Sequence, residues 1–375
     1  MTPAPTILFL VGETSGDQHA VAVARSLKER LPGVRLLALG GPRLESEGAQ
    51  VLEPMDRLAV VGFVEVIRHL GFFRGLLGRV RDLLASGSVD LVVAVDFPGF
   101  NLRAVEVAHR EGVPVLYYIA PKFWAWKPGR VQRLAAHTRH VASILPFEIP
   151  LLEEAGVRAT FVGHPLMEVE RAYPDRDAFC RELGLDPARP ILAVLPGSRE
   201  VEVGHHLDTF AAAARQVVAV RPEAQPVFCR APSLPEGRLA AAGFPVTGDA
   251  GALFHHARVG LVKSGTGTLE AALAGLPMVV AYRTHPLTFA LARRLLRSRW
   301  ISLPNLVANR AVVPELLQGG ASPEELTRAL LAIWDDGPAR QDQIDGLSGI
   351  HRALGTAGAG DRVAALAVEI MEGRR

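Results

Sequence analysis

An aspartate ends a continuous apolar run in the segment LVVAVDFPGFN, residues 91–101. A carboxylate at the carboxyl end of a buried strand can take a proton from an acceptor hydroxyl, which makes Asp96 a candidate general base. Asn101 follows five residues later and is a candidate to shape this loop or to contact a sugar. The alternative is that Asp96 only caps a helix or a turn.

A small-residue turn follows another apolar run in the second half of the chain. The run ILAVL leads, after one proline, into Gly197, Ser198 and Arg199. Glycine lets the backbone approach a ligand, serine offers a hydroxyl, and arginine can fork onto a phosphate or a carboxylate. The alternative is an ordinary strand-to-helix turn in which Ser198 caps the helix.

A second turn of this kind has the sequence SGTGT and precedes a helix-like segment. Its residues Ser264, Gly265 and Thr266 would expose N–H groups at the positive end of a helix dipole, which suits a pyrophosphate. Glu270 lies one turn into the helix, where its carboxylate could accept both ribose hydroxyls or simply be favoured by the dipole. Two such turns in one half of the chain favour a nucleotide diphosphate over a bare scaffold.

The turn GETSGD follows the first apolar run of the chain and is another candidate ligand loop. It does not match G-x-G-x-x-G, and no such fingerprint follows either first strand, which disfavours an NAD oxidoreductase. Ser15 and Gln18 form the S-x-x-Q pattern of a capping box, so helix initiation explains part of the turn. It does not explain Glu13 and Asp17, and we favour a substrate loop that starts at Gly12.

Two tryptophans lie among basic residues in the segment KFWAWKPGR. Trp124 and Trp126 have Lys122, Lys127 and Arg130 as neighbours. Such a cluster can stack on sugars, bind phosphates or sit at a membrane interface. Tryptophans are more commonly core anchors, and at this point both uses stay open.

Residues 63–84, FVEVIRHLGFFRGLLGRVRDLL, alternate large apolar residues with arginines. A helix with an aromatic and leucine-rich face bordered by arginines can lie on an anionic bilayer. The alternative, with equal weight, is an amphipathic helix whose apolar face belongs to the domain core. The candidate membrane residues are Phe72, Phe73, Arg74, Leu76 and Arg79.

Composition and charge exclude several classes of protein. The formal net charge is +2, from 41 basic and 39 acidic residues, so no general surface for nucleic acids is expected. The two cysteines, Cys180 and Cys229, do not form a C-x-x-C pair, which argues against a disulfide framework or a zinc knuckle. The first apolar run is short and has no basic region before it, so it indicates a strand rather than a signal peptide. No run of 18 apolar residues predicts a membrane span.

Metal chemistry is not expected either. Asp175 and Asp177 spell D-x-D, but they precede a helix-like segment rather than follow a strand, so we interpret them as capping residues. Glu202 and His206 share a helix face by their spacing, and we interpret them as polar side chains on the protein surface. We therefore predict neither a metal nor a cofactor.

Short apolar runs alternate with helix-period stretches, which is typical of β-α-β units with buried parallel strands. The expected strands lie in 6–12, 34–41, 89–97, 113–120, 140–147, 190–198, 224–232, 244–250, 259–265 and 276–283. A polar, proline-containing stretch near 165–190 interrupts the rhythm, and a chain of 375 residues is too long for one ordinary core. We predict two doubly wound α/β domains with a ligand site in the cleft between them, beyond the carboxyl ends of the strands.

The chain resembles the lipid-A-disaccharide synthase family nearly end to end. The residues that carry the resemblance include GETSGD, MDRLAVVGFVEVI, DFPGFN, FWAWKPGRV, LPFE, FVGHPL, LPGSR, SGTGTLEAALAGLPMVVAYR and SLPN followed by PELLQ. The resemblance implies a GT-B fold of two Rossmann-like domains facing a cleft. It divides the chain into an acceptor-side domain at 1–170 containing the membrane-facing segment 63–84, a UDP-sugar domain at 185–345, and closing helices at 346–375. We expect those helices to pack back on the first domain or on a partner subunit.

The family joins UDP-2,3-diacylglucosamine to 2,3-diacylglucosamine 1-phosphate (lipid X) by an inverting, metal-independent transfer. The resemblance makes Asp96 the base for the acceptor hydroxyl. It places the 197–199 loop, the 264–266 loop and Glu270 on the donor side, and it adds Asn305, Glu315 and Gln318 there. It assigns Gly12, Glu13, Ser15, Asp17, Asn101, Trp124 and Trp126 to the acceptor side. It also implies a peripheral enzyme on the cytoplasmic face of the inner membrane, and it leaves a homodimer open.

Departures from the family pattern include Ala120, where members commonly have serine. Two alternatives remain beside the family reaction. One is another GT-B enzyme that uses a UDP-N-acetylhexosamine with a different lipid acceptor, or an epimerase of the same architecture with its own acid and base. The other is a non-catalytic UDP-sugar-binding module, which would bind UDP without any turnover.

Overall fold

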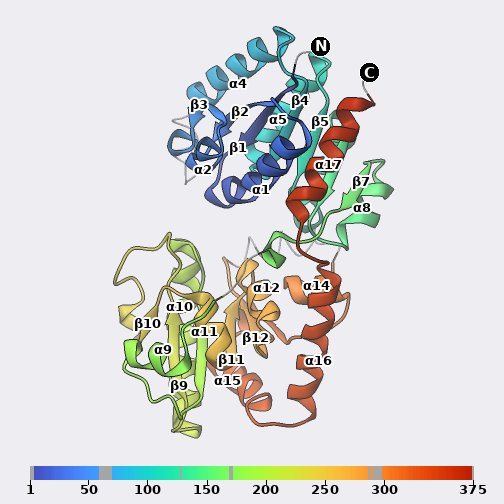
Figure 1. Ribbon diagram of the computed structural model, residues 1–375. Helices are drawn as coiled ribbons and strands as arrows, with labels where there is room; N and C mark the ends of the chain where they lie inside the picture. The colour runs from blue at the N-terminus through green and yellow to red at the C-terminus, as the bar shows by residue number, and fades with distance from the viewer. Residues whose placement is uncertain are drawn as a thin grey trace. The chain divides into compact units, whose positions relative to one another are not determined.

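The computed structural model describes residues 4–58, 70–126, 129–168, 172–285, 289 and 298–373. They divide into two compact units, and Figure 1 shows the ribbon of each. The first unit contains residues 1–168 together with 354–375, and the second contains 169–353. The C-terminal division falls between residues 353 and 354 rather than at the expected 345.

The first unit is built on a parallel sheet with strand order β3-β2-β1-β4-β5-β6-β7. The chain starts in the middle of the sheet, winds to one edge, returns to the middle and winds to the other edge, which is the Rossmann pattern. Its strands are β1 (Thr6–Val11), β2 (Arg35–Gly40), β3 (Gln50–Pro54), β4 (Leu91–Val95), β5 (Val115–Tyr118), β6 (His140–Ser143) and β7 (Ala159–Phe161).

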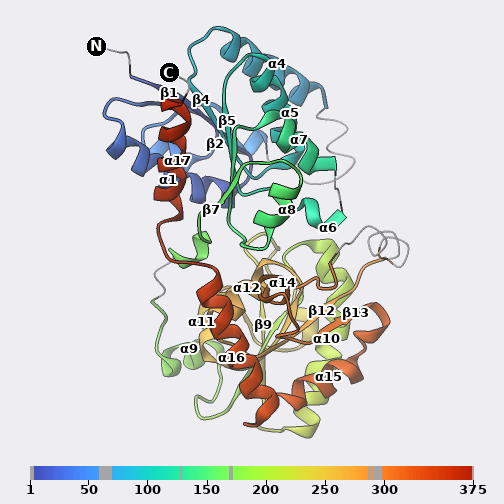
Figure 2. The same ribbon diagram turned by 90° about the vertical axis from the view of Figure 1, so that its right-hand side faces the viewer.

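Helices cover both faces of this sheet because its strands are apolar on both sides. Ile7, Phe9 and Val11 of β1 pack towards α1 and α17, while Leu8 and Leu10 of the same strand pack towards α4, α5 and α7. Figure 2 shows the two helix layers on either side of the sheet. The helices are α1 (Thr14–Arg30), α2 (Pro42–Ser46), α4 (Leu70–Ala85), α5 (Pro98–Arg110), α6 (Phe123–Trp126), α7 (Gly129–His137), α8 (Glu148–Glu154) and α17 (Ala359–Glu372), with 3-10 turns η1 (Met55–Arg57) and η2 (Pro165–Met167).

The second unit repeats the design with strand order β10-β9-β8-β11-β12-β13, all parallel. Helices α10 and α15 pack on one face around buried Phe210, Leu326 and Trp334. The strands are β8 (Ile191–Leu195), β9 (Gln225–Cys229), β10 (Val246–Thr247), β11 (Ala257–Lys263), β12 (Met278–Tyr282) and β13 (Glu315–Leu317). The helices are α9 (Arg176–Leu183), α10 (Glu200–Val220), α11 (Ala250–His256), α12 (Thr266–Leu273), α14 (Leu303–Ala308), α15 (Pro323–Ala332) and α16 (Pro338–Ala353), with 3-10 turns η3 (Ala240–Ala242) and η4 (Gln318–Gly320).

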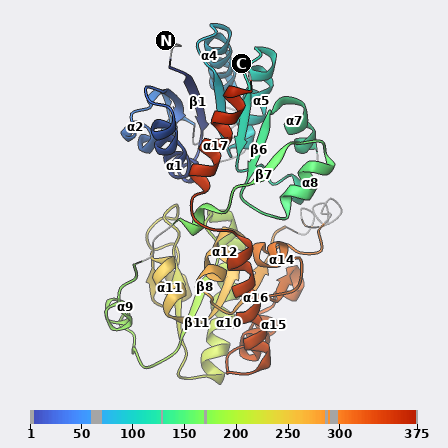
Figure 3. The ribbon, with the colours of Figure 1, turned by 45° about the vertical axis from the view of Figure 1, so that its right-hand side comes forward.

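The two closing helices belong to different units. Helix α16 packs on α12 and α14 of the second unit, as Figure 3 shows. Helix α17 packs on α1 of the first unit, where Asp361 accepts a hydrogen bond of 2.6 Å from the Ser26 hydroxyl. Gly360 allows this close approach, because a Cβ there would lie 2.5 Å from the Cβ of Ala22.

The predicted fold class, two doubly wound α/β units, is confirmed. All ten expected strands are present. The edge strands β3, β7 and β13 were not expected from the sequence, because each is short and carries polar or half-buried residues.

Candidate active site

Asp96 directly follows β4 in a conformation that few L residues adopt. Its φ is 45° and that of Phe97 is 47°, so two consecutive left-handed residues turn the chain sharply into α5. The N–H of Asp96 donates to the Tyr118 carbonyl at 3.0 Å, which ties the turn to β5. Such strained positions concentrate at functional sites, where the surrounding structure fixes them.

Two buried side chains hold the backbone of this turn. The Asn101 amide donates to the Asp96 carbonyl at 2.8 Å and to the Leu10 carbonyl at 3.1 Å, and the Tyr117 hydroxyl donates to the Asp96 carbonyl at 2.7 Å. Asn101 is fully buried. Of the two uses that the sequence left open for Asn101, the structure therefore supports shaping of the loop.

The charge on Asp96 is tuned by its surroundings. The pKa of its carboxyl is raised to about 6, mainly by burial and also by the nearby negative charge of Glu13. Lys122, the Phe97 N–H and Arg130 act in the opposite direction. A carboxyl with a pKa just below neutral is still ionised at pH 7 and is a stronger base than an ordinary aspartate.

The opening turn GETSGD starts helix α1 in a different way from the one that the capping box predicted. Helix α1 begins at Thr14 with Glu13 as its N-cap, so the prediction that Ser15 caps the helix is wrong. Ser15 lies exposed in the first turn. Gly12 is required where it stands, because a Cβ there would lie 2.3 Å from the Phe97 ring.

Asp17 has structural partners within the first unit. It is 1% exposed and accepts hydrogen bonds from the N–H groups of Arg43 at 3.0 Å and Leu44 at 3.3 Å. These are orphan donors at the start of α2, and a buried carboxylate satisfies them. The first turn of α1 directs Asp17 inwards, which the sequence pattern alone did not reveal.

Trp124 lies in α6, just after β5, and is half-buried. Its indole N–H donates to Glu148 at 2.9 Å. Trp126 ends the same helix, and its side chain lies outside the described residues, as does all of Lys127. Glu148 lies in the LPFE motif, and no role was predicted for it from the sequence.

The turn at Gly197 is held by the carboxylate of Glu202, for which the sequence predicted no such role. Glu202 accepts from the Ser198 N–H at 3.1 Å and pairs with Lys263 at 2.7 Å. Gly197 has φ 139°, and a Cβ there would lie 2.7 Å from the Cβ of Glu202. Arg199 is the N-cap of α10, so Ser198 is not the helix cap, and the Arg199 side chain is 76% exposed.

Glu202 and His206 do not form a polar pair on the protein surface, contrary to prediction. His206 is fully buried, its Nδ1–H donates to the Glu202 carbonyl at 2.6 Å, and its Nε2 accepts from the Arg283 N–H at 2.8 Å. Burial lowers the pKa of His206 to about 4, so the imidazole is neutral at pH 7. It links α10 to the end of β12. By contrast, Asp175 does cap a helix as predicted, because it accepts from the Ala178 N–H at the start of α9.

The SGTGT turn starts a helix as predicted. Helix α12 begins at Thr266 with Gly265 as its N-cap, and Thr266 is exposed. The Ser264 hydroxyl donates to the Ile301 carbonyl at 3.1 Å, and Glu270 is half-buried in the second turn of the helix. This turn follows β11 and the Gly197 turn follows β8, and the two strands are neighbours in the sheet. Both turns therefore lie at the same edge of the second unit.

Three further donor-side candidates are bonded to the protein itself. Asn305 is fully buried and accepts from the N–H groups of 312 and 313. Glu315 accepts from Asn305 at 2.9 Å and from both the N–H and the hydroxyl of Ser302. Gln318 bonds both the N–H and the carbonyl of Thr284, at 2.8 and 2.9 Å. These contacts give the three residues a structural role, which is to shape the segments that lead to and from β13.

The candidate membrane helix is largely part of the core. Leu76 is 1% exposed inside the first unit, and Phe72 and Phe73 pack against that core. This placement contradicts a membrane contact for Leu76, because a helix on a parallel sheet must use its apolar face to cover the sheet. Arg74 and Arg79 are both exposed, and Arg79 pairs with the buried carboxylate of Glu53. Residues 63–69 of the predicted segment lie outside the described residues.

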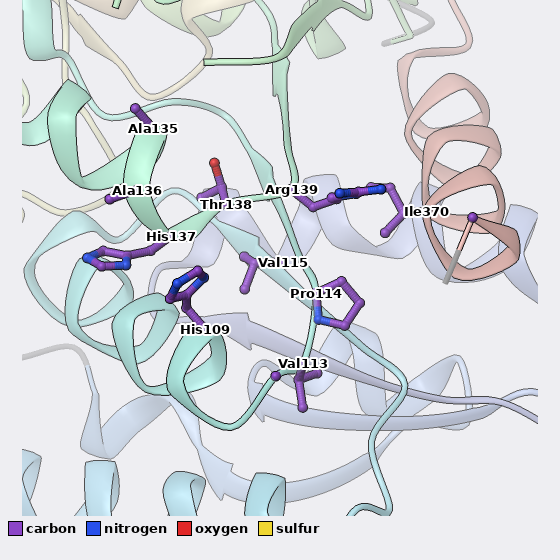
Figure 4. A pocket seen from close by; sticks show the side chains of 12 residues that line it. His109, Val113, Pro114, Val115, Ala135, Ala136, His137, Thr138, Arg139 and Ile370 are labelled. Carbon is purple, nitrogen blue, oxygen red and sulfur yellow. The ribbon is translucent and has the colours of Figure 1, made fainter. Parts of the chain in front are cut away.

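A cavity of about 550 Å³ opens at the other end of the first sheet, where β5 and β6 begin (Figure 4). His109 and His137 line it with ring centroids 5.2 Å apart, beside Arg139 and Ile370. It lies at the opposite edge of the sheet from Asp96, which follows the end of β4.

Across the ranges that the structure describes, no group of three or more His, Cys, Asp or Glu side chains is placed to hold a metal ion.

The family model and the relatives in sequence agree on one family, whereas the solved structures share the fold alone. A family model described as lipid-A-disaccharide synthetase matches residues 7–357. The lipid-A-disaccharide synthase of Geobacter sulfurreducens is 36% identical over 372 residues, 97% of each chain. The enzyme of the same name from Pseudomonas syringae pv. tomato is 41% identical over 365 residues, 94% of each chain. Among solved structures, the glycotransferase of kitacinnamycin shares the fold with a TM-score of 0.65 at 18% identity, over 99% of this chain and all of that one.

Proposed function

The chain belongs to the lipid-A-disaccharide synthetase family, and on that premise we propose the substrates, the mechanism and the site residues of its reaction. It is a glycosyltransferase that forms the lipid A disaccharide, as the resemblance in its motifs predicted. We propose that the donor is UDP-2,3-diacylglucosamine and that the acceptor is 2,3-diacylglucosamine 1-phosphate. The products are then a β-1,6-linked disaccharide 1-phosphate and UDP.

The observation that carries the mechanism is the environment of Asp96. Its carboxyl has a pKa of about 6, and its backbone carbonyl is fixed by Asn101 and Tyr117. In the proposed step the ionised Asp96 takes the proton of the acceptor 6-hydroxyl. The oxygen attacks the anomeric carbon from the face opposite UDP, the new C–O bond forms as the bond to UDP breaks, and the configuration inverts.

The departing UDP carries the negative charge that the second unit must stabilise. Arg199 offers an exposed guanidinium beside the Gly197 turn, and the N–H groups at the start of α12 point out of the SGTGT turn. Charge-assisted hydrogen bonds of this kind stabilise a leaving phosphate without a metal ion. We assign the diphosphate to these two turns and the ribose to Glu270.

The place of action follows from the acylated substrates, which reside in a membrane. Within the described residues, no helix has the length and the apolar character needed to cross a bilayer. We propose that the enzyme acts as a peripheral protein on the cytoplasmic face of the inner membrane. Exposed Arg74 at the start of α4 is a candidate contact for anionic lipid headgroups.

The reaction is tested by UDP release from UDP-2,3-diacylglucosamine, with and without lipid X and with EDTA present. Release that depends on lipid X and survives EDTA supports the transfer and its metal independence. Release with UDP-N-acetylglucosamine and another lipid acceptor, but not with lipid X, would assign a different acceptor. UDP binding without any release would instead identify a binding module.

A further inference from the structure

Glu148 is a buried carboxyl that the proposed reaction does not yet use. It is the first residue of α8, just beyond β6, and it is 1% exposed. Strands β4, β5 and β6 are neighbours in the first sheet. Asp96 follows β4, Trp124 lies beyond β5 and Glu148 follows β6, so all three lie at the same edge of the sheet, where parallel strands end.

Both carboxyl oxygens of Glu148 have partners. The Trp124 indole N–H donates to Oε1 at 2.9 Å, and the Ser143 hydroxyl is 2.5 Å from Oε2. The ring of Phe147 meets the indole edge-on, with centroids 5.2 Å apart. The indole is therefore held by a hydrogen bond and by an aromatic contact from two adjacent residues.

Lys122 and Asp96 are the charged groups that act on Glu148. The pKa of the Glu148 carboxyl is raised to about 7, mainly by burial, and the charge of Asp96 also acts to raise it. The bonds from Ser143 and Trp124 and the charge of Lys122 lower it. Near pH 7 the carboxyl therefore exchanges between its neutral and its ionised form.

The hydrogen-bond network accommodates the neutral form. The Ser143 hydroxyl lies 3.1 Å from the Leu145 carbonyl and accepts from the Leu145 N–H at 3.2 Å. A protonated Glu148 can donate to Ser143, which then donates to Leu145. Glutamine reproduces this arrangement, because its carbonyl accepts from Trp124 and its amide donates to Ser143.

We propose that Glu148 is a positioning residue of the transfer reaction, which fixes the Trp124 indole on the acceptor side. The proposal rests on the proposed function for the assignment of Trp124 to the acceptor. The hydrogen bond between Trp124 and Glu148 does not depend on the identity of the substrate. Glu148 touches no reacting atom and acts through Trp124.

The proposal is tested with the single variants Glu148→Ala, Glu148→Gln and Trp124→Phe. A double variant combines Glu148→Ala with Trp124→Phe. Glu148→Ala and Trp124→Phe should each raise the KM for lipid X about tenfold, because each removes the buried hydrogen bond that holds the indole. The affinity for UDP should stay within about twofold, since the donor is assigned to the other unit. The double variant should be no worse than Glu148→Ala alone, and Glu148→Gln should keep the wild-type KM.

A uniform loss of kcat and thermal stability without a change in KM would reduce Glu148 to a purely structural residue and overturn the proposal. Additive effects in the double variant would also overturn it, because independent residues add and coupled residues do not. If Glu148→Ala does not fold, Trp124→Phe decides the question, since an unchanged KM for lipid X contradicts the proposal.

Tryptophan fluorescence tests the contact without any substrate. Ionisation of Glu148 should change the emission of the bonded indole as the pH passes through about 7, and this transition should be absent in Glu148→Gln and in Trp124→Phe. A transition that persists in both variants would overturn the contact. Absent turnover in the wild type would count against the proposed substrates, whereas wild-type turnover with unchanged variants would count against Glu148 alone.

Discussion

The side-chain amide of Asn101 donates to the backbone carbonyl of Asp96, which lies five residues earlier in the chain. The same amide reaches the carbonyls of Leu10 and Val95, so it ties together the ends of the two central strands β1 and β4. The left-handed turn at Asp96 and Phe97 is thus held from inside the protein. The proposed base therefore owes its position to a neighbouring side chain that is itself fully buried.

Replacing Asn101 with alanine should therefore affect both stability and turnover. The carbonyls it serves would be left buried with fewer donors, at a cost of about 2–3 kcal/mol in the free energy of unfolding. We expect kcat to fall while the affinity for UDP is kept, measured by urea unfolding and steady-state kinetics. The exposed amide variant Gln341→Ala is the control. A stable and fully active Asn101→Ala enzyme would show that the turn at Asp96 keeps its conformation without the Asn101 amide.

Replacing Asp96 with asparagine should remove the base and leave the donor site intact. General base catalysis contributes a factor of about 10² to 10⁴, so turnover should fall by that amount. The dissociation constant of UDP, measured by calorimetry, should change less than about twofold, because Asp96 has no assigned contact with the donor. Turnover close to the wild type would assign the base to another residue.

The rate should depend on pH through the ionisation of Asp96. The raised pKa of about 6 means that kcat/KM should rise as the pH increases through that value and fall below it, where the carboxyl is protonated. Glu13→Gln removes a negative neighbour, so it should lower the pKa of Asp96. The rise in kcat/KM, which forms the acidic limb of the pH profile, should then move to lower pH. Lys122→Met removes a positive neighbour and should move the limb to higher pH. Shifts in the same direction for both variants would contradict the assignment of the limb to Asp96.

Arg199 should contribute to donor binding with little effect on folding. Its guanidinium is 76% exposed and lies 4.0 Å from Glu202, so the folded protein loses little without it. Arg199→Ala should weaken UDP binding about tenfold, the usual effect of losing a hydrogen bond to a charged group. Arg328→Ala on α15, which removes another exposed arginine, serves as the matched control. Equal affinities of both variants for UDP would show that the diphosphate does not bind at the Gly197 turn.

Arg74 is the best remaining test of membrane attachment by α4. Arg79 is a poor choice for charge reversal because it pairs with the buried carboxylate of Glu53. Arg74→Glu should weaken binding to anionic vesicles by at least about 1 kcal/mol, a typical contribution per basic residue. Arg328→Glu controls for the change in net charge. Cosedimentation that is the same for both variants would exclude Arg74 from the membrane contact.

The sequence by itself determined the architecture and the family. Buried parallel strands are continuous apolar runs, and their alternation with helical stretches leaves few topologies. The same local signals predicted the start of α12 at the SGTGT turn and Asp175 as the cap of α9. These features depend on residues that are close in sequence, so a linear pattern contains the information.

Only the tertiary structure decided which polar side chains remain available for chemistry. Asp17, Asn305 and Gln318 look like ligand residues in a linear sequence, but each is bonded to a segment of the protein itself that lies 7 to 34 residues away. Glu202 and Glu148 drew no functional interpretation from the sequence, yet folding brings Lys263 and Trp124 to them. A polar group removed from water must find a partner, and that partner is chosen by packing rather than by spacing along the chain.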